Sequence, residues 1–294
     1  MQPMVTPGQG PEAPPADLPV LDLSGPALRA ALEKLVAGSE AQGGVERYAE
    51  ALGLKARLLR SALAQDALPA LSADAFGRVC AFIAPARRRI APYLAGSGFE
   101  NLRDAVAELT RELEDTRLAD RRVARFCARF PGDRKHRWVR DLAAEVLHFL
   151  DPERYPLMCR WVWDRASNTG ALREIWHGER VDEMTIEVPD AYATFVSLRQ
   201  ELSQFLADNG VFRDTLHYVD LLLAQVYADY ICERGGTYLR ADFSAPEDPM
   251  QFVRRLLGLD GVNEKTGRLR LKRADGGSTR LSEAQMLDLV EGKA

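Results

Sequence analysis

The sequence predicts a mainly α-helical protein: a multi-helix bundle in two packed helical regions, with a small C-terminal β-hairpin and helix. Three observations predict this fold class. Apolar residues recur at helical spacing through most of the chain. Serine, aspartate, proline and glycine stand where these segments should begin and end. Alternation of apolar and polar residues, which is typical of a strand, is confined to two short stretches.

The N-terminal part is expected to form a disordered tail over 1–18 and a small helical bundle over 19–96. The tail holds five prolines and two glycines and lacks the apolar segment of a secretory signal. Ser24 should cap the first helix, in which Leu28 begins an apolar repeat that ends near Gly43. Further short helices are expected over 45–54, 55–65, 72–85 and 86–94.

Residues 97–260 are expected to form a larger helical domain. It opens with two amphipathic segments, the second of which carries Val123 and Phe126 on its apolar side. Asp133 should then cap a helix over 134–150. A short exposed strand is expected over 181–188, and further helices over 189–209, 214–235 and 249–257.

Residues 261–294 are expected to form an appendage made of a β-hairpin and a helix. RLRLKR and TRL flank the turn sequence ADGGS, and the alternation in the first stretch points its arginines and lysines outward. Ser282 and Gln285 then form a capping box, which predicts a final helix.

Charge, cysteine content and hydropathy limit the classes of protein to which the chain can belong. A net charge of −4 and a pI of about 5.7 argue against a nucleic-acid binder that uses its whole surface, although local basic patches stay possible. The four cysteines are far apart and favour buried thiols in a reducing compartment. No stretch reaches the roughly 20 apolar residues of a membrane span. We therefore expect a soluble, cytoplasmic protein.

Each of the four histidines follows an acidic residue by three positions, which suggests a metal site. Two of the pairs, Glu145/His148 and Glu174/His177, have the Glu-x-x-His spacing of carboxylate-bridged di-iron bundles. Such bundles require ligands that point inward, and a helical wheel places His148 and His177 away from the apolar sides of their helices. We therefore expect helix-end charges here, and no metal or other cofactor.

The most distinctive local feature is a basic segment, in which nine arginines and lysines lie between Arg117 and Arg140. Arg121, Arg125 and Arg129 recur at intervals of four residues opposite an apolar stripe, which predicts a ridge of guanidinium groups. Arginine beside exposed aromatic residues is typical of protein hot spots and of base-stacking surfaces. The expected binding residues are Arg121, Arg125, Arg129, Arg134, Lys135, Arg137, Trp138, Arg140, Trp161 and Trp163.

Internal pairing is the alternative interpretation of this ridge. The preceding helix carries an acidic row at the same spacing, so the two helices can neutralise each other across a hairpin. The tryptophans can equally belong to the core. The acidic row is Glu100, Asp104, Glu108 and Glu112.

Known catalytic patterns are missing, which favours a non-catalytic protein. The sequence contains neither a Gly-rich phosphate loop, nor a G-x-S-x-G nucleophile elbow, nor an H-E-x-x-H motif. The segment LHFLDPERYPLM is loosely similar to small helical bacterial proteins with helix-hairpin-helix-like parts, a likeness that transfers no functional residue.

Three functions are compatible with these observations. The first is a non-catalytic cytoplasmic accessory or interaction protein that binds an acidic protein partner through its arginine ridge. The second is a nucleic-acid-binding protein that uses the same ridge. The third is a metal-dependent, di-iron-like oxidoreductase that uses the Glu-x-x-His pairs. The sequence leaves the identity of the partner and the oligomeric state open.

Overall fold

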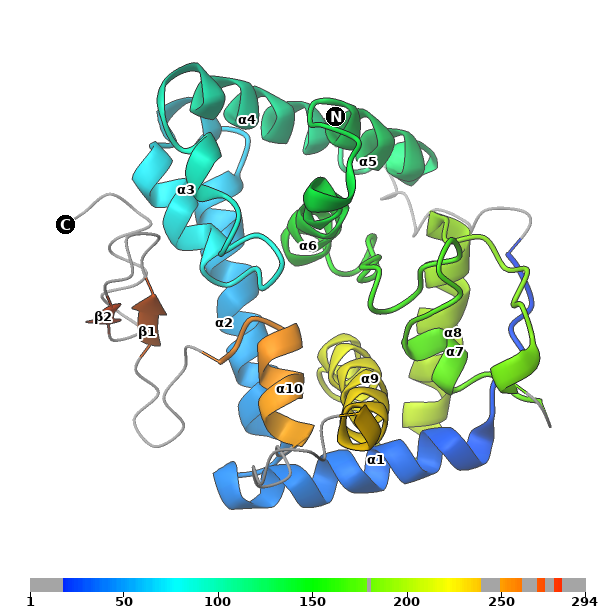
Figure 1. Ribbon diagram of the computed structural model, residues 1–294. Helices are drawn as coiled ribbons and strands as arrows, with labels where there is room; N and C mark the ends of the chain where they lie inside the picture. The colour runs from blue at the N-terminus through cyan, green and yellow to red at the C-terminus, as the bar shows by residue number, and fades with distance from the viewer. Residues whose placement is uncertain (1–17, 179–180, 239–248, 261–268, 273–277, 282–294) are drawn as a thin grey trace, which may run out of the picture.

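The computed structural model describes residues 18–178, 181–238, 249–260, 269–272 and 278–281. Within these ranges the protein is mainly helical, as the sequence predicts (Figure 1). The α-helices are α1 (Gly25–Ser39), α2 (Val45–Leu63), α3 (Ala73–Cys80), α4 (Gly96–Leu109), α5 (Ala119–Ala128), α6 (Trp138–Leu150), α7 (Ala171–Glu174), α8 (Tyr192–Asp208), α9 (Thr215–Tyr238) and α10 (Pro249–Leu256). The 3-10 helices are η1 (Glu40–Gln42), η2 (Leu68–Ala70), η3 (Ala91–Tyr93), η4 (Thr116–Leu118), η5 (Arg134–His136) and η6 (Val181–Glu183).

Two of the predicted N-caps are confirmed. The Ser24 hydroxyl accepts a hydrogen bond from the Ala27 amide at 3.4 Å at the start of α1. One Asp133 carboxylate oxygen accepts from the amides of Lys135 and His136 at 2.8 and 3.1 Å. These bonds satisfy amide groups at the start of α1 and of η5, so both segments begin where the sequence predicts, although the helix expected over 134–150 is η5 followed by α6.

Two predicted element types are wrong. The expected helix over 86–94 is a series of turns followed by η3. The expected strand over 181–188 is η6 and irregular backbone. Side chains satisfy this backbone in place of a neighbouring strand, because the Asn168 amide donates to the Met184 carbonyl and accepts from the Ile186 N–H.

One helix boundary is also wrong, since the helices expected over 45–54 and 55–65 are the single helix α2. The apolar stripe runs without interruption through Leu52, Ala56, Leu59 and Leu63, all of which are buried. Burial of this continuous stripe outweighs the modest cost of a glycine within a helix at Gly53.

The C-terminal appendage is described only in part. The strands β1 (Leu269–Lys272) and β2 (Ser278–Leu281) pair antiparallel, with Leu269 opposite Leu281. The connecting residues and the predicted final helix lie outside the described residues, so the hairpin–helix unit stays a prediction. The predicted disordered tail also lies outside them, apart from its last residue.

Helix α6 occupies the interior, between α2, α5 and α9 (Figure 1). From Trp138 to Phe149 every side chain except that of Arg140 is buried. A single apolar cluster joins residues from Leu21 to Leu259. Because α2 packs on both α6 and α9, the core is continuous across the predicted boundary at residue 96, and the division into two helical regions stays a prediction.

None of the helices in the described ranges has an apolar stretch long enough to cross a bilayer.

A buried ion pair holds α2, α6 and the end of α10 together. The Lys55 ammonium lies 2.6 Å from a carboxylate oxygen of Glu145, and both side chains are at most 2% exposed. The same ammonium donates to the Leu257 carbonyl at 2.8 Å and lies over the Phe149 ring. Burial raises the pKa of the Glu145 carboxyl, and Lys55 opposes this effect.

Gly258, the residue after Leu257, makes this contact possible. Its backbone is left-handed, with φ at +72°, and a Cβ atom there would lie 1.8 Å from the Phe82 carbonyl oxygen. Only glycine fits a position with both constraints.

We predict that Lys55→Met lowers the free energy of unfolding by about 3–5 kcal/mol, because it leaves the Glu145 carboxyl buried without its partner. The double variant Lys55→Met/Glu145→Leu should lose less than Lys55→Met alone, since no unpaired charge remains. Urea denaturation of the three proteins measures both effects. Equal losses in the single and double variants would contradict this account.

Candidate functional site: the groove between α4 and α5

The hollow that carries the clearest chemistry is a groove between α4 and α5 with a volume of about 460 Å³. Both helices lie along one side of the molecule next to α6 (Figure 1). The floor is partly apolar, with Leu109 and Phe126 buried beneath it. The charged residues that line the groove are Arg111, Arg121, Arg122, Arg125, Arg129, Asp104, Glu108 and Glu112.

The amphipathic pattern of α5 explains why arginines line the groove. Ala119 and Phe126 are buried, and α5 packs on α6. Arg121, Arg125 and Arg129 project from the other side and are exposed. The predicted ridge is therefore a surface feature, and it forms one wall of a groove.

Within the described part of the chain, internal pairing of this ridge involves one carboxylate. Glu108 of α4 lies 2.6 Å from Arg129 and 4.0 Å from Arg125. The hydrogen bond from Arg129 lowers the pKa of Glu108, so this carboxylate stays ionised at neutral pH. Among the residues that the structure describes, Arg111 and Arg121 have no carboxylate within ion-pair distance. The acidic row therefore neutralises only part of the ridge.

Arg122 forms the floor of the groove and was not singled out from the sequence. Its side chain is only 7% exposed. One of its nitrogens donates to the Asp115 carbonyl and to the Tyr155 hydroxyl, each at 2.7 Å, and another donates to the Glu112 carbonyl. Among the described residues no carboxylate lies within ion-pair distance of this buried guanidinium, and Arg122 is one of the residues that line the groove. Burial also raises the pKa of the Tyr155 hydroxyl to about 12, which keeps it neutral.

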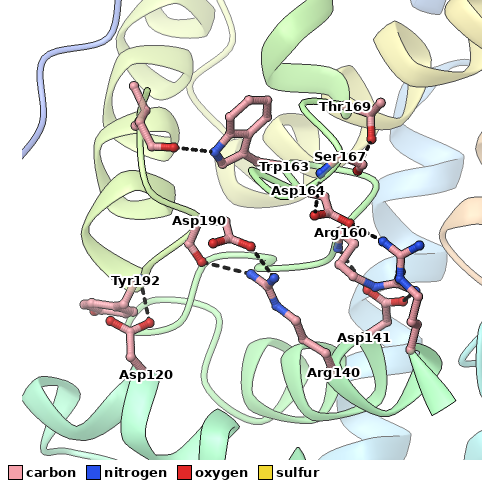
Figure 2. Close-up of polar contacts among 12 residues, drawn as sticks. Asp120, Arg140, Asp141, Arg160, Trp163, Asp164, Ser167, Thr169, Asp190 and Tyr192 are labelled. Atoms are coloured by element: carbon pink, nitrogen blue, oxygen red, sulfur yellow. Dashed lines mark hydrogen bonds and ion pairs between the residues drawn. The ribbon is translucent and has the colours of Figure 1, made fainter. Parts of the chain in front are cut away.

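Two further arginines of the basic segment tie α6 to the segment between α6 and α8. The Arg140 guanidinium pairs with the Asp190 carboxylate and donates to the Asp190 carbonyl at 2.9 Å (Figure 2). Arg137 lies 2.7 Å from Asp164, whose side chain is buried. Both residues therefore have internal partners, and they lie outside the groove lining.

The predicted aromatic part of the binding surface is largely in the core. Trp138 and Trp163 are buried, so neither ring is accessible to a partner. The Trp163 indole nitrogen donates to the Val188 carbonyl at 3.0 Å (Figure 2). Trp161 is half-buried and packs against Tyr227, away from the groove. Helical spacing could not distinguish these rings from exposed ones, because an aromatic residue is equally compatible with a core.

Arg134 and Lys135 are exposed and belong to η5, outside the groove. The predicted set of binding residues is therefore divided among the groove, the interior and a second surface.

The orientation predicted for His148 is wrong. A helical wheel predicts orientation only for a helix with a solvent side, whereas α6 is enclosed and the His148 side chain is 2% exposed. The His148 Nδ1 atom lies 2.8 Å from the Tyr155 carbonyl, which can only accept, so this nitrogen carries the proton. The Nε2 atom faces Asp220 at 2.9 Å. His148 and Asp220 of α9 thus form a buried pair.

The second Glu-x-x-His pair is not assembled into a site with the first. Glu174 is half-buried and His177 is exposed. No group of three or more metal-ligating side chains occurs within the described ranges of the chain.

Comparison of the chain with family models, with curated proteins and with solved structures finds no match.

We predict that Arg140 and Arg121 differ in their effect on stability. Arg140→Gln removes the bonds to Asp190 and should lower the free energy of unfolding by about 1–3 kcal/mol. Arg121→Gln removes an exposed charge and should change it by no more than about 0.5 kcal/mol. Urea denaturation tests this difference, because a shifted midpoint with an unchanged dependence on urea concentration reports a change in stability. A loss of unfolding free energy in Arg121→Gln as large as that in Arg140→Gln would contradict the prediction.

Proposed function

We propose that this chain is a non-catalytic, cytoplasmic interaction protein that binds an acidic segment of a partner protein in the groove between α4 and α5. The observation that carries the proposal is the lining of the groove, in which five guanidinium groups meet three carboxylates. Arginine presents a planar fork of donors that matches a carboxylate, so it suits an acidic polypeptide.

The buried Arg122 strengthens this interpretation. A buried charge in the floor of a groove is screened by solvent less than an exposed one. Its hydrogen bonds to carbonyl groups hold the guanidinium in place, so an incoming carboxylate meets a positive potential that needs no rearrangement.

The mixed lining favours a polypeptide over a nucleic acid. A phosphate backbone carries a charge at every nucleotide, and Asp104, Glu108 and Glu112 would repel it along the groove. A polypeptide can place neutral residues next to these carboxylates and acidic residues next to the arginines. This complementarity would give specificity in addition to affinity.

The chemistry of the lining residues supports a role in binding rather than in catalysis. The groove is lined by arginine, acidic and apolar residues, and its lining includes no histidine, cysteine, lysine or serine. The thiols Cys80 and Cys159 are buried without disulfides, which supports a reducing compartment.

We predict that Arg121→Gln/Arg125→Gln/Arg129→Gln, the groove variant, binds a labelled oligoglutamate peptide about ten-fold more weakly than wild type. The reason is that three exposed charge contacts of at most about 1 kcal/mol each are removed. Fluorescence anisotropy at low salt measures this affinity. A charge-matched control changes Arg29, Arg47 and Arg213, which are exposed outside the groove. The control variant should bind as wild type does, and equal weakening in both variants would sink the proposal.

We also predict that Glu108→Gln strengthens binding of the same peptide. Glu108 is an internal competitor for Arg125 and Arg129, so its neutral isostere leaves both guanidinium groups available. Glu100→Gln is the matched control, because Glu100 is exposed on the same helix and does not line the groove. An affinity that falls in Glu108→Gln would show that the ion pair helps to form the site.

Native pull-down with wild type and the groove variant tests whether the same surface recruits a cellular partner. Loss of an acidic protein from the variant is the expected result. An identical set of captured proteins would count against the groove.

A further inference from the structure

A second basic surface lies where the turn before η3 meets η5. Its cations are Arg88, Arg89, Arg134 and Lys135, all of which are exposed. The Arg89 guanidinium donates to the Lys135 carbonyl at 2.7 Å, which joins two segments that are 46 residues apart. None of these four residues lines the groove between α4 and α5. We call them the η5 patch.

The acidic residues next to the η5 patch are already engaged. The Asp133 Oδ1 atom accepts hydrogen bonds from the amides of Lys135 and His136. The same oxygen lies 2.7 Å from the His136 Nδ1 atom. These bonds, above all the one with the His136 ring, lower the pKa of Asp133, so its carboxylate is ionised and already serves as a hydrogen-bond acceptor within η5. Asp260 pairs with Arg87 at 2.5 and 2.7 Å. Among the described residues, no carboxylate pairs with the four cations of the patch.

An aromatic ring is fixed beside these cations. The Tyr93 ring contacts His136 edge-on, with 6.2 Å between ring centroids. It also packs against Phe130 and Trp138, with centroid separations of 5.4 and 5.8 Å. Three neighbouring rings therefore hold Tyr93 in one orientation while part of it stays accessible. Partial burial and, second, the nearby Asp133 charge raise the pKa of Tyr93, so its hydroxyl stays neutral at physiological pH.

We propose that the η5 patch binds single-stranded nucleic acid, with its cations on successive phosphates and one base stacked on Tyr93. Exposed cations interleaved with a fixed aromatic ring are the combination that sequence-tolerant single-strand binders use. The groove lining holds three carboxylates, whereas the carboxylates next to the patch, Asp133 and Asp260, are already hydrogen-bonded within the protein. An acidic peptide would gain from the cations but not from stacking on the ring. The proposal does not depend on the function proposed for the groove.

The test is fluorescence anisotropy with a labelled oligothymidylate of about 20 nucleotides, which exceeds the usual single-strand site size. Affinity is measured between about 50 and 200 mM salt. The triple variant Arg88→Gln/Arg134→Gln/Lys135→Gln should bind the oligonucleotide at least about ten-fold more weakly than wild type. The slope of log affinity against log salt concentration should become shallower by about 2, because each lost phosphate contact contributes about 0.7. The groove variant is the control and should bind the oligonucleotide as wild type does.

Stacking is tested separately at Tyr93. Tyr93→Leu should weaken binding roughly ten-fold, whereas Tyr93→Phe, which keeps the ring, should bind as wild type does. Urea denaturation identifies a Tyr93→Leu protein that fails to fold. In that case the triple variant and Tyr93→Phe decide the outcome.

Four results would overturn the proposal. The first is absence of oligonucleotide binding by wild type at the lowest salt. The second is a salt dependence of binding that is unchanged in the triple variant. The third is a loss of affinity in Tyr93→Phe as large as that in the triple variant. The fourth is that wild type binds vesicles containing anionic lipid but not the oligonucleotide, and that the triple variant loses the vesicle binding. This result would assign the patch to a membrane surface.

Discussion

The enclosure of α6 is the constraint on which the rest of the structure depends. A helix without a solvent side must find partners for its polar groups inside the protein, because an unpaired buried charge costs several kcal/mol. Glu145 therefore meets Lys55 of α2, His148 meets Asp220 of α9, and Asp141 lies 2.7 Å from Arg160. Each pair links α6 to a different part of the chain, so together they select one packing of the surrounding helices.

The same enclosure divides the basic segment into residues with different roles. Arginines that lie against the interior are taken up by carbonyl groups and carboxylates, as with Arg122 and Arg140. Arginines on the outer side of α5, such as Arg121, remain accessible. Arginines of one short segment therefore differ in whether the protein itself supplies their partners. The ion pair between Glu108 and Arg129 is exposed. In the proposed function, a carboxylate of the partner would take the place of Glu108 in this pair.

The two proposed surfaces differ in what surrounds their cations. The groove holds carboxylates that a partner must avoid, so its selectivity would come from the pattern of charges. The η5 patch holds a fixed tyrosine ring and engaged acidic residues, so its selectivity would come from phosphate density and stacking. With both surfaces on one chain, a protein partner and a nucleic acid could be held together.

Local patterns in the sequence determined the helical class, the N-caps at Ser24 and Asp133 and the guanidinium ridge on α5, because each depends on residues within a few positions of one another. Tertiary structure alone decided the rest. Whether α6 has a solvent side depends on helices distant in sequence, and His148 and Asp220 are 72 residues apart. The contact between Lys55 and Leu257 spans 202 residues, and the burial of Arg122 follows from Tyr155. A helical wheel gives the angle of each side chain but not what lies on each side of the helix.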